Sequence, residues 1–473
     1  MNLAKSTVYV FLARAFGSVI SMLGLVYFAR SLGAEQLGIF FLFQALLELF
    51  AIPADLGLQG AVIKRLSEES DPADRSEIVS TAIVLFSLSL ILVSLIAFNF
   101  RGIINSYLGA KLAVALIIVV ILNEFFKLGI NVLKGELRVD ETAMMSFSKQ
   151  IIFNCVAIAL IFSGSDYRGL VYALAFSTGV ISLISIYKWN TPIGSPSLRA
   201  ARSLFNFSKF SVVAFVDSYL YNWLDIAVIG LLIGQAAVGA YEVAWRVSAL
   251  VMLFTSAIET TILPQVSSWD ASGSMKEIED LLPVVILISL AFVIPAFFGS
   301  IVLGEAIIRL AFGEQFESGF VVLIILMSGK LFEAIDRINK NLLSGIDHPE
   351  LRALAVIVSI IINISLNFYL VQQIGMEGAA IATVVSFSLS TVIVTYMLSK
   401  FMNIRIMYTE IIICVICSVL MSVCVHLLKE FMNTDSVVSI LFMVFMGVII
   451  YFLLLVIVPN TREQFFEIVS TYY

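Results

Sequence analysis

The sequence predicts an all-α, polytopic membrane protein of about 14 transmembrane helices, in two six-helix lobes followed by two additional C-terminal helices. Three observations predict this fold class: the composition, the spacing of long apolar runs, and an internal repeat. Of the 473 residues, 60% are hydrophobic and 13% are charged. Soluble domains are about half apolar and about one quarter charged, so lipid must solvate much of this surface.

The long apolar runs are the predicted spans. About 20 predominantly apolar residues cross the hydrocarbon core as a helix, because every backbone N–H and C=O must be satisfied within the segment. Fourteen such runs occur, near residues 8–30, 37–60, 78–100, 112–133, 148–164, 168–188, 208–232, 236–264, 281–303, 317–343, 351–371, 376–399, 408–428 and 437–457. The first run is too long for a signal-peptide core, so we expect it to be a retained span.

The basic residues predict the orientation of these spans. With the N-terminus in the cytoplasm, 18 of the 28 Lys and Arg residues fall in cytoplasmic segments and 5 in outer segments. Cytoplasmic loops of membrane proteins are enriched in Lys and Arg. We therefore expect a multi-pass protein of the cell (plasma) membrane, with both termini in the cytoplasm.

The least membrane-like stretch divides the chain. Residues 191–207 include two prolines and two arginines but no acid, which is typical of a cytoplasmic linker. The prediction is an N-terminal lobe over 1–190 and a C-terminal lobe over 208–400. Residues 401–473 then form two additional transmembrane helices and a short cytoplasmic tail.

Similar segments recur in the same order in both predicted lobes. Residues 32–40 match 233–241 at an offset of 201, and 127–135 match 337–345 at an offset of 210. Six predicted spans precede the linker and six follow it, so the two lobes share one orientation. A parallel repeat of this kind is common in transporters, where the substrate binds between the halves near the bilayer midplane.

Charged residues inside the spans are the candidate functional positions. A charge at the bilayer centre costs at least ~2.5–3.5 kcal/mol, so it is a functional candidate by default. Asp217, Tyr221 and Asp225 follow an i, i+4, i+8 pattern and share one face of the seventh span, with Asn222 nearby. This helix is too polar to face lipid, so we expect it to line water or the other lobe.

Two short spacings predict ion pairs within spans. Glu242 and Arg246 are four residues apart, and Lys330 and Glu333 are three apart. Two interpretations stay open for each: the pair only neutralises itself and so permits insertion, or the cation binds a ligand. For Lys127, near the cytoplasmic end of its span, a snorkelling anchor is slightly favoured over a ligand site.

Several chemistries find no support in the sequence. A net charge of −6 argues against nucleic-acid binding, which needs a concentrated basic surface. Two histidines cannot form a histidine-rich metal site, and the Cys414-x-x-Cys417 pair lies in an apolar run typical of a helix. With no phosphate-binding loop and no nucleophile elbow, we expect no enzyme activity, catalytic residue, metal or cofactor.

Several motifs together resemble one family. Arg14 lies in the first span, residues 29–38 contain Ala-Arg-x-Leu-Gly-x3-Leu-Gly, and residues 55–58 read Asp-Leu-Gly-Leu. In the second half, residues 238–241 and the glycine- and alanine-rich start of the twelfth span agree. This pattern resembles the polysaccharide-transporter branch of the multidrug/oligosaccharidyl-lipid/polysaccharide (MOP) flippase superfamily, over roughly residues 1–400.

The resemblance implies a flippase. It would move a lipid-linked oligosaccharide, on a polyprenyl or dolichyl phosphate or pyrophosphate carrier, from the cytoplasmic to the outer leaflet by alternating access. The product would serve surface polysaccharide or glycoprotein glycan assembly, with membrane lipid and glycan-assembly enzymes as partners. The candidate substrate-binding residues are Arg14, Lys127, Tyr221, Asn222, Arg246 and Lys330. The candidate ion-coupling residues are Asp55, Asp217, Asp225 and Glu242.

Rival functions remain open at this point. A multidrug or organic-cation antiporter of the same superfamily usually has an acidic cavity and twelve helices. The acid-rich seventh and eighth spans favour this function, whereas the two additional C-terminal spans argue against it. A membrane enzyme would need a folded loop outside the bilayer, and the outer segments here are too short for one. A scaffold without transport is the third alternative.

Overall fold

The structure, a computed structural model, describes residues 3–432 and 436–457, with the side chains of 3–15, 209–222, 260, 261, 263 and 264 excepted. Helices joined by short turns make up nearly all of this described part, which contains no strand. The all-α prediction is confirmed. The chain divides into two compact units, Met1–Gly239 (unit 1) and Ala240–Tyr473 (unit 2).

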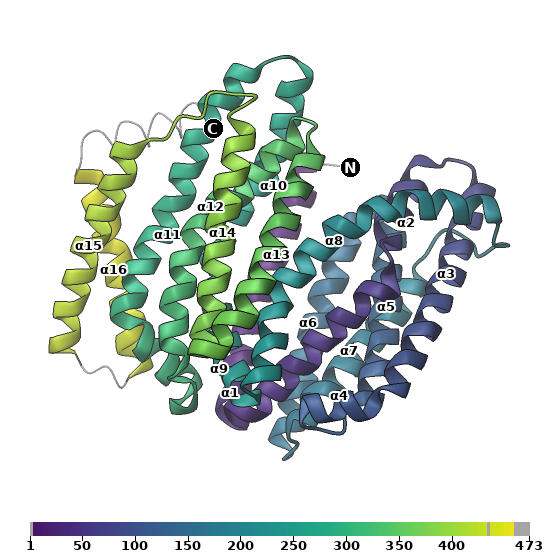
Figure 1. Cartoon of the computed structure of the whole chain (residues 1–473), viewed down its shortest axis with the longest axis horizontal. Coiled ribbons are helices and arrows are strands. Elements are labelled where there is room, and N and C mark those ends of the chain that lie inside the picture. The colour runs from purple at the N-terminus through teal and green to yellow at the C-terminus, as the bar shows by residue number, and fades with distance from the viewer. Residues whose placement is uncertain (1–2, 433–435, 458–473) are drawn as a thin grey trace. The chain divides into compact units, whose positions relative to one another are not determined.

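Unit 1 is built around its first helix, which packs against α6 and α8 (Figure 1). Helix α5 packs against α7, and α2 packs against both α5 and α8. The helices are α1 (Leu3–Asp55), α2 (Leu58–Glu68), α3 (Pro72–Asn99), α4 (Arg101–Leu108), α5 (Ala113–Gly135), α6 (Val139–Phe162), α7 (Tyr167–Tyr187), α8 (Leu198–Leu232) and the start of α9 (Gln235–Ala249).

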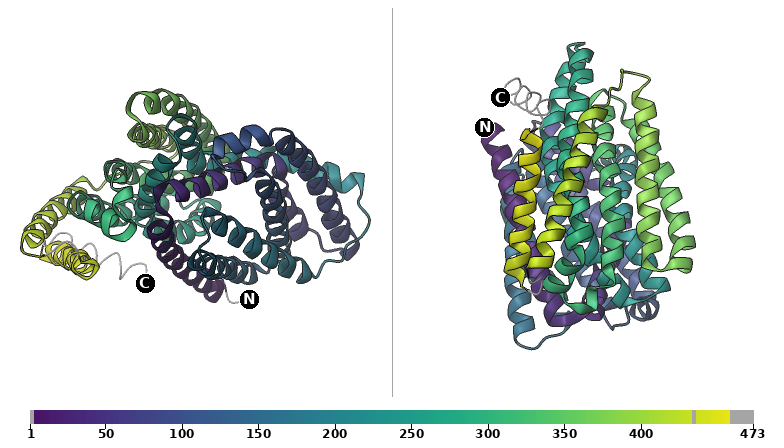
Figure 2. Two further views of the ribbon diagram at one scale, coloured as in Figure 1. Left: turned by 90° about the horizontal axis from the view of Figure 1, so that it is seen from below. Right: turned by 90° about the vertical axis from the view of Figure 1, so that its left-hand side faces the viewer.

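Unit 2 has α12 and α14 at its centre, with α11 packed on one of them and α13 on the other. Helix α15 packs on α11 with α16 beside it, so the last two helices lie together at one edge of this unit (Figure 2). The helices are α10 (Met252–Ala271), α11 (Met275–Phe312), the short η1 (Glu314–Phe316), α12 (Gly319–Gly345), α13 (Pro349–Ile374), α14 (Met376–Leu398), α15 (Tyr408–Phe431) and α16 (Val437–Ile457).

The matched segments of the internal repeat contact each other at Gly38 and Gly239, close to a break in α1 at Gly33. Gly33, at φ 77°, breaks α1 in two, and a residue without a Cβ adopts this backbone at little cost. A Cβ on Gly38 would overlap the carbonyl oxygen of Gln235, and one on Gly239 would overlap that of Ala34. The two equivalent turns therefore pack reciprocally, backbone against backbone, which explains why small residues recur there.

Part of the predicted linker is helical. Helix α8 begins at Leu198, and the Ser197 hydroxyl caps it by accepting a hydrogen bond from the backbone N–H of Ala200. Before this helix, Glu136 Oε1 accepts hydrogen bonds from the backbone N–H groups of Asn190 and Thr191, at 3.0 and 2.8 Å. Because α8 packs on α1, α2 and α3, it belongs to unit 1 by packing. The predicted lobe boundaries concern sequence similarity, and they stay a prediction.

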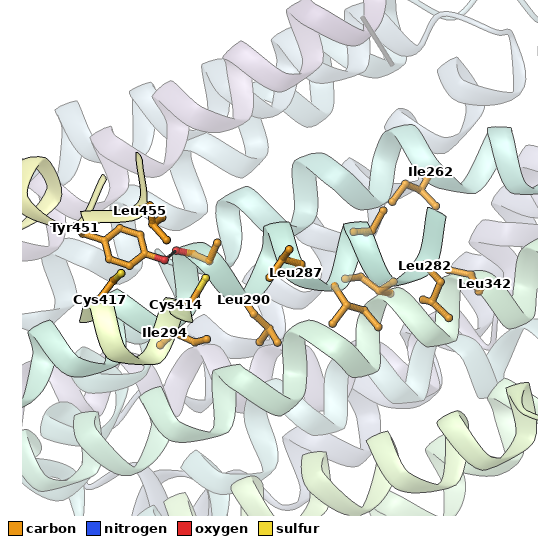
Figure 3. Close-up of a cluster of buried hydrophobic side chains, with 14 of the residues drawn as sticks. Ile262, Leu282, Leu287, Leu290, Ile294, Leu342, Cys414, Cys417, Tyr451 and Leu455 are labelled. Atoms are coloured by element: carbon orange, nitrogen blue, oxygen red, sulfur yellow. Dashed lines mark hydrogen bonds between the residues drawn. The ribbon is translucent and has the colours of Figure 1, made fainter. Parts of the chain in front are cut away.

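The last two helices complete the apolar core of unit 2 (Figure 3). The fully buried Tyr451 of α16 donates its hydroxyl to the carbonyl of Ala291 in α11, at 2.9 Å. Cys414 and Cys417 of α15 are free thiols buried in the same cluster. The interpretation of the Cys-x-x-Cys pair as apolar helix side chains agrees with this packing.

The described helices have the length and composition of membrane spans. Ten are long and apolar enough to cross a bilayer, and an eleventh is added if α9 and the start of α10, bent by 52°, form one broken span. Large apolar side chains also cover the outside, including Leu88 and Leu95 of α3 at 60% and 63% exposed. The chain is therefore a multi-pass membrane protein, and the number of fourteen spans stays a prediction.

Candidate functional site

A buried ion cluster lies inside unit 1, centred on α5. The Lys127 Nζ lies 3.0 Å from Glu124 Oε1 on the same helix and 3.1 Å from Glu48 Oε2 on α1. The Glu124 side chain has no exposed surface, and that of Lys127 is 15% exposed. The interpretation of Lys127 as a snorkelling anchor is wrong, because two carboxylates hold its ammonium inside the unit.

An amide joins this cluster to one of the predicted acids. Gln59 of α2 donates from Nε2 to Glu124 Oε2 at 3.4 Å and accepts at Oε1 from Asn131 Nδ2 at 3.1 Å. Its backbone N–H donates to Asp55 Oδ1 at 3.1 Å. Asp55 is thus linked to Glu124 through one residue, Gln59, which the sequence analysis did not single out.

A second cluster lies inside unit 2, on α12. Glu333 accepts from Lys330 Nζ at 2.7 Å and from Arg337 through Nη2 and Nε, at 2.7 and 2.9 Å. The Lys330 and Glu333 side chains are 2% and 3% exposed, whereas that of Arg337 is 44% exposed. The Lys330 ammonium also lies 4.0 Å from the ring centroid of Trp245 in α9. The predicted Lys330–Glu333 pair is confirmed, whereas a role of Lys330 in substrate binding stays a prediction.

The predicted pair on α9 is more accessible. Arg246 Nε donates to Glu242 Oε1 at 2.7 Å, which confirms the i, i+4 pairing. The Glu242 side chain is 5% exposed, but that of Arg246 is 34% exposed. Of the predicted cations whose side chains the structure describes, Arg246 therefore presents the largest surface to a ligand.

A further buried ion pair of unit 2 was not predicted from the sequence. Asp336 of α12 pairs with Lys340 at 2.7 Å and accepts a hydrogen bond from the Ser390 hydroxyl of α14 at 2.6 Å. All three residues are buried. The i, i+4 spacing of Asp336 and Lys340 was a signal in the sequence, whereas Ser390 carried none, because its distance from α12 along the chain hides the contact.

The two ion clusters occupy equivalent positions of the repeat. Lys127 and Arg337 are 210 residues apart, and each pairs with an acid one turn earlier on its own helix, Glu124 or Glu333. Comparing the acids that precede these two cations would have indicated the Glu124–Lys127 and Glu333–Arg337 pairs from the sequence alone.

Four predicted residues, Arg14, Asp217, Tyr221 and Asn222, lie outside the side chains that the structure describes. Asp225 of α8 is described and is buried, at 2% exposed. Among the described residues, no group of three or more His, Cys, Asp and Glu side chains has the arrangement needed to hold a metal ion.

The comparisons with known proteins identify the family. The family model described as "Polysaccharide biosynthesis protein" matches residues 27–320. The chain is 40% identical over 469 residues to the "Probable low-salt glycan biosynthesis flippase Agl15" of Haloferax volcanii, covering 99% of this chain and 98% of that protein. The chain belongs to the polysaccharide biosynthesis protein family. The resemblance to the polysaccharide-transporter branch of the MOP flippase superfamily is thereby confirmed.

Two further comparisons agree with this family. The "Probable flippase AglR" of the same organism is 30% identical over 406 residues, covering 84% of each chain. A solved structure titled "Lipid II flippase MurJ, inward closed conformation" covers 97% of this chain and 100% of its own, with a TM-score of 0.83 at 16% identity. At that identity the likeness establishes a shared fold.

Proposed function

We propose that this protein is a flippase that moves a lipid-linked oligosaccharide, on a polyprenyl or dolichyl phosphate or pyrophosphate carrier, from the cytoplasmic to the outer leaflet. The observation that carries the proposal is the 40% identity, over nearly the whole of both chains, to a protein named as a glycan biosynthesis flippase. Both relatives compared above are named as flippases rather than enzymes, which supports a function in transport without catalysis.

The physical demands of this substrate agree with a transport protein inside the bilayer. A hydrophilic glycan cannot cross ~30 Å of hydrocarbon unaided, whereas its isoprenoid tail can remain in lipid throughout. The carrier phosphate needs a cationic partner, and an arginine can bind it through two hydrogen bonds. Arg246, paired with Glu242 and still 34% exposed, is the first candidate. Lys330 and Lys127 would have to leave their buried carboxylates before they could bind phosphate.

The topology we propose has fourteen spans. Gly33 divides α1 into two of them, α9 and α10 together form one, and α8 and α12 add two that the ten apolar helices do not include. Both termini lie in the cytoplasm of a cell whose plasma membrane holds the protein. Lobes 1–190 and 208–400, joined by 191–207, alternate access during transport, and the helices of 401–473 lie outside the repeat.

The acids keep a separate proposed role in ion coupling. Glu242 is buried and pairs with Arg246, Asp55 is buried and accepts a hydrogen bond from the backbone N–H of Gln59, and Asp225 is buried in α8. A proton or sodium ion that binds one of these carboxylates would neutralise its charge, while the lipid substrate itself stays chemically unchanged. The acids alone would also suit an organic-cation antiporter, so the experiment below includes an arm for that function.

Deletion of the gene tests the function directly. We expect the lipid-linked oligosaccharide to accumulate in the inner leaflet, surface glycan to fall, and sensitivity to cationic drugs to stay unchanged. When returned to the deletion strain, the Arg246→Gln variant should flip the lipid-linked oligosaccharide roughly tenfold more slowly than the wild type, because one charge-assisted hydrogen bond to the phosphate is lost. The matched control is Arg405→Gln, whose side chain is 71% exposed and only weakly paired. Increased drug sensitivity with normal surface glycan would contradict the proposal and favour the antiporter.

A further inference from the structure

An apolar groove in unit 1 has no role in the function proposed so far. It has a volume of about 460 Å³ and lies where the end of α1 and the start of α2 meet α3 and α8. This volume is within the range of small-molecule sites, about 300–1,000 Å³. Its lining residues are Phe50, Pro53, Leu56, Leu58, Leu85, Leu88, Ser89, Leu92, Val93, Ile96, Phe205 and Ser208.

The described walls of the groove are almost entirely hydrocarbon. Its two hydroxyls are already used within the protein, because Ser89 donates to the carbonyl of Ala54 at 2.6 Å and Ser208 to that of Phe205 at 3.2 Å. Among the described lining residues these two hydroxyls, which could still accept a hydrogen bond, are the only side-chain polar groups, whereas a buried water needs two to four polar partners. The groove therefore favours an apolar chain.

The groove opens towards lipid along α3. Leu88 and Leu92 line it and are both 60% exposed, on a helix that qualifies as a membrane span. From Leu85 to Ile96 the lining follows α3 for about 17 Å at 1.5 Å per residue, roughly half of the ~30 Å hydrocarbon core. It can therefore hold a segment of a long chain, while the rest of the chain stays in the bilayer.

One of the residues that line the groove has a strained backbone. Leu56 has φ 50° and lines the groove between α1 and α2, followed by Gly57 at φ 74°. A leucine in the left-handed region is unfavourable, and such strain concentrates at ligand clamps and switch regions.

Two cations lie on α2, one of the helices that line the groove, beside an aromatic ring of α8. Lys64 Nζ and the Arg65 guanidinium lie 5.3 and 5.8 Å from the ring centroid of Phe207, two residues beyond the groove residue Phe205. Glu68 pairs with both cations, at 3.4 and 3.1 Å, which leaves one net positive charge. Arg65 Nε is buried and has no hydrogen-bond partner. An anionic headgroup is the complement of this cluster.

We propose that the groove binds part of the isoprenoid tail of the anionic carrier lipid, with the carrier phosphate beside Lys64 and Arg65. This inference rests on the proposed function, because it names a binding site for that substrate. Ordinary annular lipid needs neither a groove nor a pair of cations on a helix that lines it, whereas a single long tail with a phosphate at its head uses both. The site would hold the tail on unit 1 while the glycan moves.

Photolabelling of the full-length protein in nanodiscs of phosphatidylcholine and phosphatidylglycerol tests the site. The probe is a polyprenyl phosphate with a diazirine on a distal isoprene unit, and labelled peptides are mapped by mass spectrometry. We expect labelling within residues 85–96, competed by unlabelled polyprenyl phosphate and not by a tenfold excess of phosphatidylglycerol. Equal labelling by a diazirine phospholipid, or none within 85–96, would overturn the proposal.

Two matched variants sharpen the test. Leu88→Trp should fill the groove and reduce labelling about tenfold, the effect of excluding roughly two methylene groups from a buried contact. Leu95→Trp places the same indole on α3 at a residue that is 63% exposed and does not line the groove, so labelling should not change. If both variants label like the wild type, the groove does not bind the tail.

A headgroup arm and a flipping assay separate the two proposals. The double variant Lys64→Gln, Arg65→Gln should weaken labelling by the phosphate probe, and labelling by an uncharged polyprenol probe should not change. If this variant labels like the wild type with both probes, the headgroup assignment is refuted. Wild-type protein that labels in the groove but does not flip lipid-linked oligosaccharide would contradict the proposed function alone. Protein that flips without groove labelling would contradict the groove alone.

Discussion

Glu333→Gln should destabilise unit 2, because one carboxylate neutralises two cations there. Removing one partner of a buried ion pair costs about 3–5 kcal/mol, since it leaves an uncompensated charge. Arg337 is 44% exposed and can be solvated, but Lys330 is 2% exposed and cannot. Trp245, 4.0 Å from the Lys330 ammonium, offsets up to about 2 kcal/mol through its ring. We therefore expect a loss near the lower end of the range, about 3 kcal/mol.

Equilibrium unfolding in mixed micelles of increasing SDS content measures this loss. The matched control is Glu305→Gln in the same unit, an exposed position, which should change the free energy of unfolding by less than about 0.5 kcal/mol. Adding Lys330→Met to Glu333→Gln should recover at least about 1 kcal/mol, because the buried ammonium is gone. Equal stability of Glu333→Gln and Glu305→Gln, or a double variant that is no more stable than Glu333→Gln, would refute the reasoning.

Two further predictions concern packing. Gly38→Ala should cost about 1–3 kcal/mol and reduce flipping, because the added Cβ overlaps the Gln235 carbonyl oxygen, whereas Gly102→Ala, with no atom within 4 Å of its Cβ, should be tolerated. The same unfolding assay checks both, and equal stability of the two would contradict the close approach. Tyr451→Phe should cost about 0.5–1.5 kcal/mol by removing its 2.9 Å hydrogen bond to α11, and the exposed Tyr408→Phe should cost nothing measurable.

The helical fold was predictable because lipid leaves the backbone few alternatives. Long apolar runs must be helices there, and each run contains enough residues to be recognised without knowing its neighbours. The break at Gly33 could also be anticipated from the repeated glycine turns. The helical start of α8 was harder, because Leu198–Phe207 is polar enough to be interpreted as a loop until the Ser197 cap and its packing on unit 1 are seen.

The ion clusters were predictable only along one helix at a time. The Glu242–Arg246 and Lys330–Glu333 pairs follow from helical spacing, and both form. Lys127 was misinterpreted because one of its carboxylates, Glu48, lies on another helix 79 residues away. Gln59 was missed because an amide in a short polar helix carries no signal until α2 is packed against α5.

Stability alone does not explain why both units contain a buried ion cluster. Well-packed apolar residues in place of a buried ion pair are often neutral or stabilising. The two clusters instead tie together specific helices: α1 and α5 through Lys127, and α9 and α12 through Lys330 and Trp245. Lys127 pairs with Glu48 on α1 and the Lys330 ammonium lies over the Trp245 ring on α9, so sliding either helix pair would separate a buried cation from its partner on the other helix. Apolar packing has no such charge requirement and would resist a slip less, so the clusters would keep these helices in register during the alternating access that we propose.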